Sequence, residues 1–380
     1  MLLRVDFNVP LTEKLLVADD TRIQKSLPTI TLLLKQNNKV IVASHLGRPN
    51  GREHTFSLKP VAAYLQKFFP NKNVLLVDDF LSPKGKTILS TQKPTDIVLL
   101  ENIRYYPGEQ TNDSIFAKHL ASLADVYVND AFGVSHRKDA SVVGITEYLP
   151  SYCGLLLEKE IKAVVKIMEE TKKPVVALIG GAKISTKIIL LSKLIDVVDY
   201  LLLGGGLANT FLLAQGFEVG KSLVEKDQVT EAKKILVHAK TKGVSLLLPL
   251  DALGLENEKV EKVYDSTNLP KNFSILDIGP KTEKAFGDII SQAKTIIWNG
   301  PVGYTEDKRF TKGTNALFNA ITHNHQAFSL VGGGDTLVSV SKNKDIAKIT
   351  HVSTGGGAML ELIEKGALPG IESLKQQHES

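Results

Sequence analysis

The chain of 380 residues is long enough for two domains, and its 43% hydrophobic and 23% charged residues are typical of a globular protein. Its 46 basic and 41 acidic residues nearly balance, and only 6% of residues are aromatic, which argues against a nucleic-acid-binding protein. No apolar run approaches the roughly 18 to 20 residues that a membrane-spanning helix needs.

Short apolar runs alternate with helical patterns along the whole chain. The runs are continuously apolar, which is typical of parallel strands covered by helices on both faces. We expect strands at residues 2–5, 40–43, 74–77, 97–100, 126–128, 175–179, 201–203, 246–248, 295–298, 328–331 and 351–353. We expect helices at residues 58–69, 113–123, 184–194, 207–215 and 359–365. The fold class is therefore α/β, with two doubly wound, Rossmann-like lobes that each contain a parallel sheet.

A long amphipathic segment separates the two halves of the chain. Apolar residues recur there at helical spacing, from Leu157 to Met168, with charged residues on the opposite face. This pattern predicts a helix over residues 152–171, which the Lys172-Lys173-Pro174 break ends. Such a helix suits a rigid spacer, so we expect an N-terminal domain at 1–151, an interdomain helix at 152–172 and a C-terminal domain at 173–355.

Two features bear on the cellular compartment. The N-terminus, Met1 to Asp6, reads directly as a strand, without the basic lead or cleavage site of a signal peptide. The single cysteine, Cys153, excludes an intramolecular disulfide framework and fits a reducing environment. We therefore expect a cytoplasmic protein with no membrane partner.

In the first half, polar residues follow several strands at their carboxyl ends, where open α/β sheets place their sites. The basic residues at these positions, or at an apparent helix start, are Arg22, His45, Arg48, Arg104, His136 and Arg137. One isolated arginine would be an ordinary surface residue, but four such arginines repel one another unless an anion neutralises them. Guanidinium groups suit phosphate and carboxylate oxygens. The first half therefore predicts a site for a small anion.

The second half is marked by glycine-rich loops between strands and helices. They are Gly180-Gly181, Gly204 to Gly206, Asn299 to Gly303, Gly332 to Gly334, and Gly355 to Gly357. Such loops offer backbone amides at helix N-termini, where phosphate binds well. Lys183 and Lys187 are four apart at an expected helix start, so we expect both to project from one face. The sequence has no Walker A or protein-kinase motif, yet a nucleotide site is still the best interpretation.

Some candidate residues have a second interpretation. Asp6 and Asn8 could either cap a turn or bind substrate hydroxyls. Asp335 follows three glycines, where it could cap a helix or hold a nucleotide-bound Mg²⁺. The pair His323 and His325 has no third ligand nearby, which favours a surface turn over a metal site.

Taken in order, these motifs resemble those of the phosphoglycerate kinase family over practically the full length. The matching strings are Leu3 to Pro10, Asp19 to Ile23, His45 to Pro49, Val128 to Gly133, Gly180 to Ser185, Asn299 to Gly303, Gly332 to Thr336, and Ser353 to Ala358. The resemblance implies a two-lobed, usually monomeric kinase that closes about a hinge. It implies the reversible transfer of a phosphoryl group between ATP and the carboxylate of 3-phosphoglycerate, with Mg²⁺, giving 1,3-bisphosphoglycerate and ADP in glycolysis.

The resemblance also implies roles for single residues. Phosphoglycerate would be bound by Asp6, Phe7, Asn8, Arg22, His45, Leu46, Gly47, Arg48, Arg104 and Arg137. The nucleotide would be bound by Lys187, Gly279, Glu306, Gly333, Gly334, Asp335 and Thr336, with Asp335 toward the metal. Catalysis would use Arg22, Lys183, Gly356 and Gly357, which would steady the transferring group. The last segment, residues 356–380, would return to the N-terminal lobe.

The implied chemistry explains why these residue types recur. A carboxylate nucleophile is already ionised at neutral pH, so the reaction needs no general base. The protein must instead align two anions and neutralise the charge on the transferring group. Arginine, lysine, backbone amides and Mg²⁺ supply that neutralisation.

The sequence departs from the family pattern at two places. The chain starts at its first strand, without the short lead that usually precedes it, so we expect some packing at this sheet edge to be missing. Where the family usually has a second histidine, two residues after Arg137, this chain has Asp139. An aspartate is unfavourable beside an anion site unless it pairs with Arg137 or Lys138, so the affinity for phosphoglycerate depends on whether Asp139 has such a partner.

Three hypotheses remain at this stage. The first is an active phosphoglycerate kinase. The second is a chain that binds the same ligands with weak or no catalysis, because of Asp139 and the missing lead. The third is a basic polyanion-binding protein, whose affinity for nucleic acid should fall steeply with salt.

Overall fold

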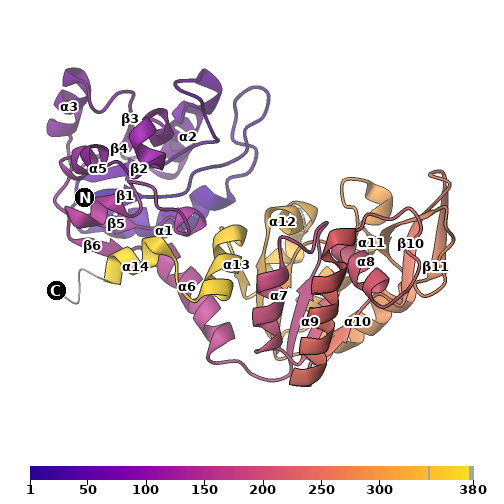
Figure 1. Ribbon diagram of the computed structural model, residues 1–380. Coiled ribbons are helices and arrows are strands. Elements are labelled where there is room, and N and C mark those ends of the chain that lie inside the picture. Colours follow the sequence, from indigo (N-terminus) through magenta and orange to yellow (C-terminus); the bar gives the residue numbers. More distant parts are fainter. Residues whose placement is uncertain (341–342, 376–380) are drawn as a thin grey trace. The chain divides into compact units, whose positions relative to one another are not determined.

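The computed structural model describes residues 1–340 and 343–375 (Figure 1). Residue contacts divide the chain into two compact units. The first comprises Met1–Lys162 with the described residues 365–375, and the second comprises Ala163–Glu364. Helix α6 (Leu155–Met168) carries the chain from the first unit into the second. That residues 152–172 act as a mechanical spacer stays a prediction.

The first unit is built on a parallel sheet with the strand order β3-β4-β2-β1-β5-β6. Its strands are β1 (Leu2–Arg4), β2 (Val40–Ala43), β3 (Asn73–Val77), β4 (Asp96–Leu100), β5 (Tyr127–Asn129) and β6 (Ser151–Cys153). Its helices are α1 (Thr21–Lys35), α2 (Lys59–Leu65), α3 (Pro83–Ser90), α4 (Pro107–Gln110), α5 (Ser114–Ala121) and α14 (Pro369–Lys375). The strands β2 and β4 are buried along their whole length, as the continuously apolar runs predict.

Helix α1 shows how the sequence positions a functional residue. Its buried residues Ile23, Ile30 and Leu33 recur at helical spacing and join the same core cluster as Leu3 and Val42 of the neighbouring strands. Packing of this face fixes the helix against the sheet. The first turn of α1 therefore lies at a defined place beside the loop that follows β1.

The C-terminal helix α14 belongs to the first unit, where it lies beside β6 (Figure 1). The amide of Gly370 donates to the Ser135 carbonyl at 2.9 Å. The side chain of Asn129 donates to the Gly370 carbonyl at 3.4 Å. The end of the described chain is thus tied to the loop after β5.

The second unit contains a parallel sheet with the strand order β15-β14-β13-β7-β8-β9. Its strands are β7 (Val175–Ile179), β8 (Tyr200–Leu203), β9 (Ser245–Leu247), β13 (Thr295–Asn299), β14 (Phe328–Gly332) and β15 (His351–Val352). The helices of this part are α7 (Ile188–Ile195), α8 (Gly205–Ala214), α9 (Val229–Lys242), α10 (Pro280–Gln292), α11 (Lys312–His323), α12 (Gly334–Val340) and α13 (Gly356–Lys365). The strand order reverses between β13 and β7, which is the point where such sheets bind ligands.

A smaller antiparallel sheet, which the sequence did not predict, completes the second unit. Its order is β11-β10-β12, with β10 (Asp251–Glu256), β11 (Val260–Asp265) and β12 (Phe273–Ile278). It packs through its own cluster, which includes Ala252 and Phe273.

The predicted α/β class with two parallel sheets is confirmed, and every expected strand overlaps an observed one. Three helix predictions were wrong at their starts by three residues or more. The helix expected over 359–365 begins earlier, at Gly356. The helix expected over 184–194 begins only at Ile188, because Ser185 instead bonds to Glu225 through both its amide and its hydroxyl. The helix expected from residue 152 begins at Leu155, because residues 151–153 pair with β5 as β6. Within the described ranges, no helix has the length and apolar character to cross a bilayer.

Candidate functional site

Four adjacent strands of the first sheet bring the basic residues together. The strands β4, β2, β1 and β5 are parallel neighbours, so the loops at their carboxyl ends meet at one edge. These loops and the first turn of α1 enclose a cavity of about 260 Å³. It is lined by Asp6, Asn8, Arg22, His45, Gly47, Arg48, Arg104, Gly133, Val134, His136 and Arg137. The four arginines and His45 picked out in the sequence thus share one cavity.

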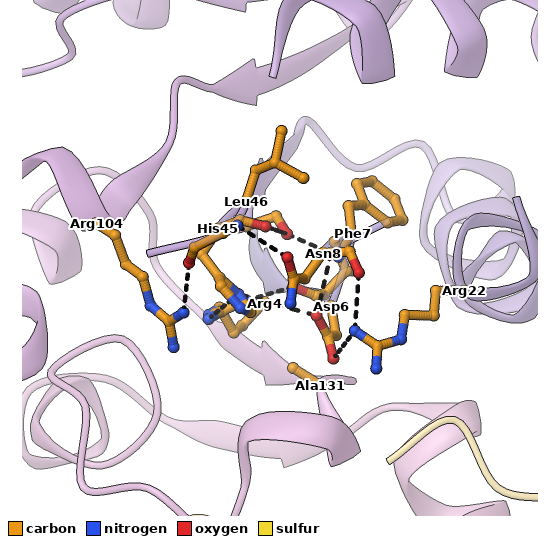
Figure 2. A network of polar contacts seen from close by, with 12 residues as sticks. Arg4, Asp6, Phe7, Asn8, Arg22, His45, Leu46, Arg104 and Ala131 are labelled. Carbon is orange, nitrogen blue, oxygen red and sulfur yellow. Dashed lines mark hydrogen bonds and ion pairs between the residues drawn. The ribbon is translucent and has the colours of Figure 1, made fainter. Parts of the chain in front are cut away.

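Arg22 is held at the cavity by the loop after β1 (Figure 2). Its Nη1 lies 3.1 Å from the Asp6 carboxylate and donates to the Asn8 carbonyl at 2.9 Å. The Asn8 side-chain oxygen accepts from the Gly47 amide at 2.8 Å. About a third of the Arg22 side chain is exposed, at 32%. Asp6 and Asn8 therefore orient the guanidinium and the loop after β2, whatever else they bind.

Arg104 is held from the other side of the cavity. Its Nη1 donates to the Gly47 carbonyl at 2.8 Å (Figure 2), and its amide donates to the Asn102 side chain at 3.1 Å. Asn102 also donates to the Leu46 carbonyl at 2.7 Å, which joins the loops after β4 and β2. Within residues 1–340 and 343–375, the buried Nε and Nη2 of Arg104 have no hydrogen-bond partner. Nη2 faces the Asp139 carboxylate at 3.7 Å, so Arg104 acts on the cavity mainly through its positive charge.

A buried hydrogen-bond network orients His45, and Arg4 is the residue that links its members. Arg4 was not among the residues predicted from the sequence. Arg4 is fully buried; its Nε donates to the Ser141 hydroxyl at 2.8 Å, and its Nη2 lies 3.3 Å from His45 Nδ1. Glu109 in turn accepts from the Ser141 hydroxyl at 2.6 Å and amide at 2.9 Å. The available signal was a charged residue inside an apolar strand, which needs partners when buried.

The concentration of positive charge shifts the titration of the site. The pKa of His45 is lowered well below its usual value, first by burial and then by the nearby charges of Arg4, Arg104 and other arginines. The pKa of the Arg104 guanidinium is also lowered, chiefly by burial and by Arg4, while Asp139 opposes this shift. His45 is therefore neutral, so it can contribute a hydrogen bond to the cavity but no positive charge.

Asp139 pairs with an arginine from another loop. Its carboxylate lies 3.7 Å from Nη2 of Arg104 and pairs with neither Arg137 nor Lys138. Lys138 is exposed whereas Asp139 is buried, so the two consecutive side chains point to opposite sides of the loop. Arg137 and Lys138, the partners considered from the sequence, are its neighbours in the chain, but the buried side of the loop faces Arg104 instead.

Phe7 and Leu46 differ from the other expected phosphoglycerate ligands. Both side chains are buried in the core cluster of the first unit and are absent from the cavity lining. Any contact with a ligand would therefore come from their backbone. Their side chains fix the two loops onto the sheet.

In the second unit, Lys187 joins the loops after β7 and β13. Its Nζ donates to the Gly180 carbonyl at 2.7 Å and to the Asn299 side-chain oxygen at 2.6 Å. Burial lowers its pKa to about 8, and Asp335 opposes that shift. Lys187 is the N-cap of α7, whereas Lys183 precedes the helix and is exposed. The two lysines are thus not on one helix face, as the spacing had predicted.

The glycine-rich loops of this unit lie close together. Gly333 has a left-handed φ of +113°, and a Cβ on Gly356 would lie 2.5 Å from its amide nitrogen. The Thr336 hydroxyl accepts from the Gly300 amide at 2.7 Å. The loops after β13, β14 and β15 therefore meet at the same edge of the sheet. At position 356, where the loop after β15 approaches the loop after β14, only glycine fits.

The remaining candidates are placed as follows. Asp335 lies in the first turn of α12 and is exposed, as is Glu306. Gly334 and Gly357 have open space around them, because a Cβ there would meet nothing within 4 Å. Gly279 is buried and precedes α10. Among the described residues, no group of three or more His, Cys, Asp or Glu could hold a metal ion by itself.

Comparisons with known proteins agree over the whole chain. The family model described as phosphoglycerate kinase matches residues 1–366. A phosphoglycerate kinase of Moorella thermoacetica is 45% identical over 381 aligned residues, covering 99% of this chain and 96% of the relative. One from Dictyoglomus turgidum is 44% identical, with 99% and 96% covered.

Solved structures of phosphoglycerate kinases also match this chain over its whole length. The phosphoglycerate kinase of Coxiella burnetii superposes with a TM-score of 0.88 at 40% identity, covering 100% of this chain and 96% of that one. That of Pyrococcus horikoshii has a TM-score of 0.87 at 29% identity, again covering 100% and 96%.

Proposed function

Because the chain belongs to the phosphoglycerate kinase family, a family of glycolytic phosphotransferases, we propose that its two strand-end sites hold the two substrates of that reaction. In this proposal, the cavity of the first unit binds 3-phosphoglycerate and the glycine-rich edge of the second binds ATP or ADP. The observation that carries it is the cavity lined by four arginines and His45. An empty cluster of this kind is costly, and a ligand that carries both a phosphate and a carboxylate neutralises it.

The cavity residues suit such a ligand in distinct ways. Arg22 is oriented through its Nη1, which leaves its other donors for the ligand. Arg104 lines the cavity and adds a positive charge there. Arg48 and Arg137 supply two further positive charges. His45, being neutral, donates one N–H to an oxygen of the ligand.

The transfer step requires positioning rather than proton transfer. An oxygen of the ionised substrate carboxylate attacks the γ-phosphorus of ATP, the new O–P bond forms, and the bond to the β-phosphate oxygen breaks to release ADP. We assign Arg22, Lys183 and the amides at Gly356 and Gly357 to the charge of the transferring group. Lys187 holds the phosphates of the nucleotide, together with Gly333, Gly334 and Thr336.

The donor set also suits Mg²⁺. This ion is usually bound by one or two carboxylates together with substrate phosphates and water. Asp335 is one exposed carboxylate beside the glycine turn at Gly333, and it fits that arrangement. When bound there, Mg²⁺ would neutralise charge on the nucleotide phosphates. We assign the nucleotide ribose to Glu306 and the adenine pocket to the segment at Gly279.

Direct transfer requires the reacting atoms to be about 3–3.5 Å apart. The two ligand sites belong to different units, so we propose that the units close on the ligands by a hinge motion and exclude water. Both sites lie on one chain, which favours a monomer as the functional unit. We propose the cytoplasm, where glycolysis takes place, as its location.

Ligand binding measured separately for each site tests the proposal. Arg22→Ala should weaken binding of 3-phosphoglycerate and leave nucleotide binding unchanged, whereas Lys187→Ala should do the reverse. Titration calorimetry with each ligand alone gives both values. If neither ligand binds, or if both variants weaken both ligands equally, the assignment of one substrate to each unit is wrong.

A further inference from the structure

The anion cavity is backed by a carboxylate that the reaction does not use. Asp139 is buried, with 5% of its side chain exposed, and its oxygen Oδ2 lies 3.7 Å from Arg104 Nη2. Arg104 lines the cavity, but Asp139 does not. The carboxylate is therefore outside the cavity lining and acts on the cavity through Arg104.

The contact between Asp139 and Arg104 is an ion pair without a hydrogen bond. Within the described ranges, neither Oδ2 of Asp139 nor Nε and Nη2 of Arg104 has a hydrogen-bond partner. The orientation of Arg104 comes instead from Gly47 and Asn102. The effect of Asp139 on the cavity is therefore mainly its charge, which acts through space.

Some of the positive charges around the cavity are paired with carboxylates and others are not. Arg22 has Asp6 at 3.1 Å, Arg104 has Asp139 at 3.7 Å, and Arg4 reaches Glu109 through Ser141. Among the residues the structure describes, Arg48 and Arg137 have no carboxylate within ion-pair distance. Asp139 thus offsets the positive charge of Arg104, and without it the cavity would have one more unpaired positive charge.

We propose that Asp139 sets the affinity of the cavity for its anionic ligand, keeping it lower than the arginines alone would give. This inference rests on the proposed function, since the ligand is taken to be 3-phosphoglycerate. Asp139 is a specificity-determining residue here and not a catalytic one. The same charge stabilises the empty site, because it lies beside a buried guanidinium that burial and Arg4 make unfavourable.

The charge-removing variant Asp139→Asn keeps the shape and an acceptor oxygen. A ligand with about three negative charges should bind about five- to tenfold more tightly, because a through-space charge acts on each of them. Inorganic sulfate, with fewer charges, should gain less. The ligand-free variant should melt about 2–5 °C lower, and saturating 3-phosphoglycerate should recover that loss.

Titration calorimetry and thermal unfolding of the full chain, with 3-phosphoglycerate and with sulfate, test the proposal. The matched control is Asp78→Asn, which removes one negative charge from an exposed pair with Arg52 in the same unit and should change neither affinity. If Asp139→Asn folds poorly, Asp139→Ser is a second neutral variant.

Tighter binding that grows with ligand charge supports the proposal. Unchanged or weaker binding of 3-phosphoglycerate by folded Asp139→Asn would overturn it and leave Asp139 only a support for Arg104. Failure of the wild-type chain to bind 3-phosphoglycerate at all would overturn the proposed function, and this inference with it.

Discussion

Nη2 of Arg4 lies 3.3 Å from Nδ1 of His45, and both side chains are buried. A guanidinium can only donate, so Nδ1 must be the acceptor and the ring proton must be on Nε2. Glu109 and Ser141 hold Arg4 in this orientation. A strand arginine remote from the ligand thus determines which face of His45 is a donor.

The first prediction concerns the titration of His45. Because burial and the surrounding arginines keep its pKa well below the usual range, His45 should stay neutral at pH values where an ordinary histidine takes up a proton. Nitrogen-15 spectra of histidine-labelled protein should show one ring with an unprotonated Nδ1 that does not titrate, and His45→Asn should remove that signal. A His45 signal that titrates near the ordinary histidine pKa would contradict the tautomer derived from Arg4.

The second prediction concerns the pH dependence of nucleotide binding. The pKa of Lys187 is lowered to about 8 by burial, so the free protein loses this positive charge as pH rises through that value. A bound phosphate favours the charged form, so nucleotide affinity should fall with rising pH above about 8. The affinity of Lys187→Met should be weaker and nearly independent of pH in this range. An equal pH dependence in both proteins would rule out Lys187 as its source.

The third prediction concerns stability. Burial raises the pKa of Glu109 to about 7, although Arg4 and Ser141 oppose the shift. Below the ordinary carboxyl pKa, Glu109 is protonated in both folded and unfolded chains and contributes nothing to the pH dependence. Between about pH 4.5 and 7 only the unfolded chain is ionised, so the first unit should lose about 3 kcal/mol of stability as pH rises.

Native-state hydrogen exchange of the β1 and β2 amides measures this loss in the first unit. In Glu109→Gln the decline over this pH range should be smaller by that amount, whereas Glu147→Gln, at an exposed site, should behave like the wild type. If stability falls equally with rising pH in the wild type and in Glu109→Gln, the group that binds the proton in the folded state is not Glu109.

The fourth prediction compares two neighbouring glycines. A Cβ on Gly356 would lie 2.5 Å from the Gly333 nitrogen, whereas a Cβ on Gly357 would meet nothing within 4 Å. Gly356→Ala should therefore destabilise the second unit by about 1–3 kcal/mol, as overpacking does. Gly357→Ala should be neutral or slightly stabilising, because alanine favours helices. Urea unfolding, followed by the fluorescence of the buried Trp298 in this unit, measures the difference in unfolding free energy between the two variants. Equal unfolding free energies would mean that the loops at Gly333 and Gly356 move apart without cost to admit the methyl group.

The place of the site was predictable from the sequence because it depends on topology. Arginines that follow separate apolar runs must meet if those runs are adjacent parallel strands, as β4, β2, β1 and β5 are. Arg4 interrupts an apolar strand, which signals a buried charge, but its contacts with Ser141 and His45 lie far along the chain and do not show in the local pattern. The pairing of Asp139 depends on which side of a loop is buried, which periodicity does not report.

The small antiparallel sheet was missed for a local reason. The turn between β10 and β11 places Asn257 and Glu258 in left-handed conformations, with φ of 51° and 64°. Hairpin turns of this kind usually carry glycine at the second position. With glutamate there, and with charged residues along the mostly exposed β11, neither the turn nor the strand gave its usual signal.

The most direct test of the account is the coupled assay of ATP-dependent phosphorylation of 3-phosphoglycerate, run on the wild type, Arg22→Ala and Lys183→Ala. We expect turnover by the wild type and a loss of about 10²–10³-fold in each variant, with the fold intact, because each substitution removes a charge that stabilises the transferring group. No turnover by the folded wild type, or normal turnover in both variants, would contradict it.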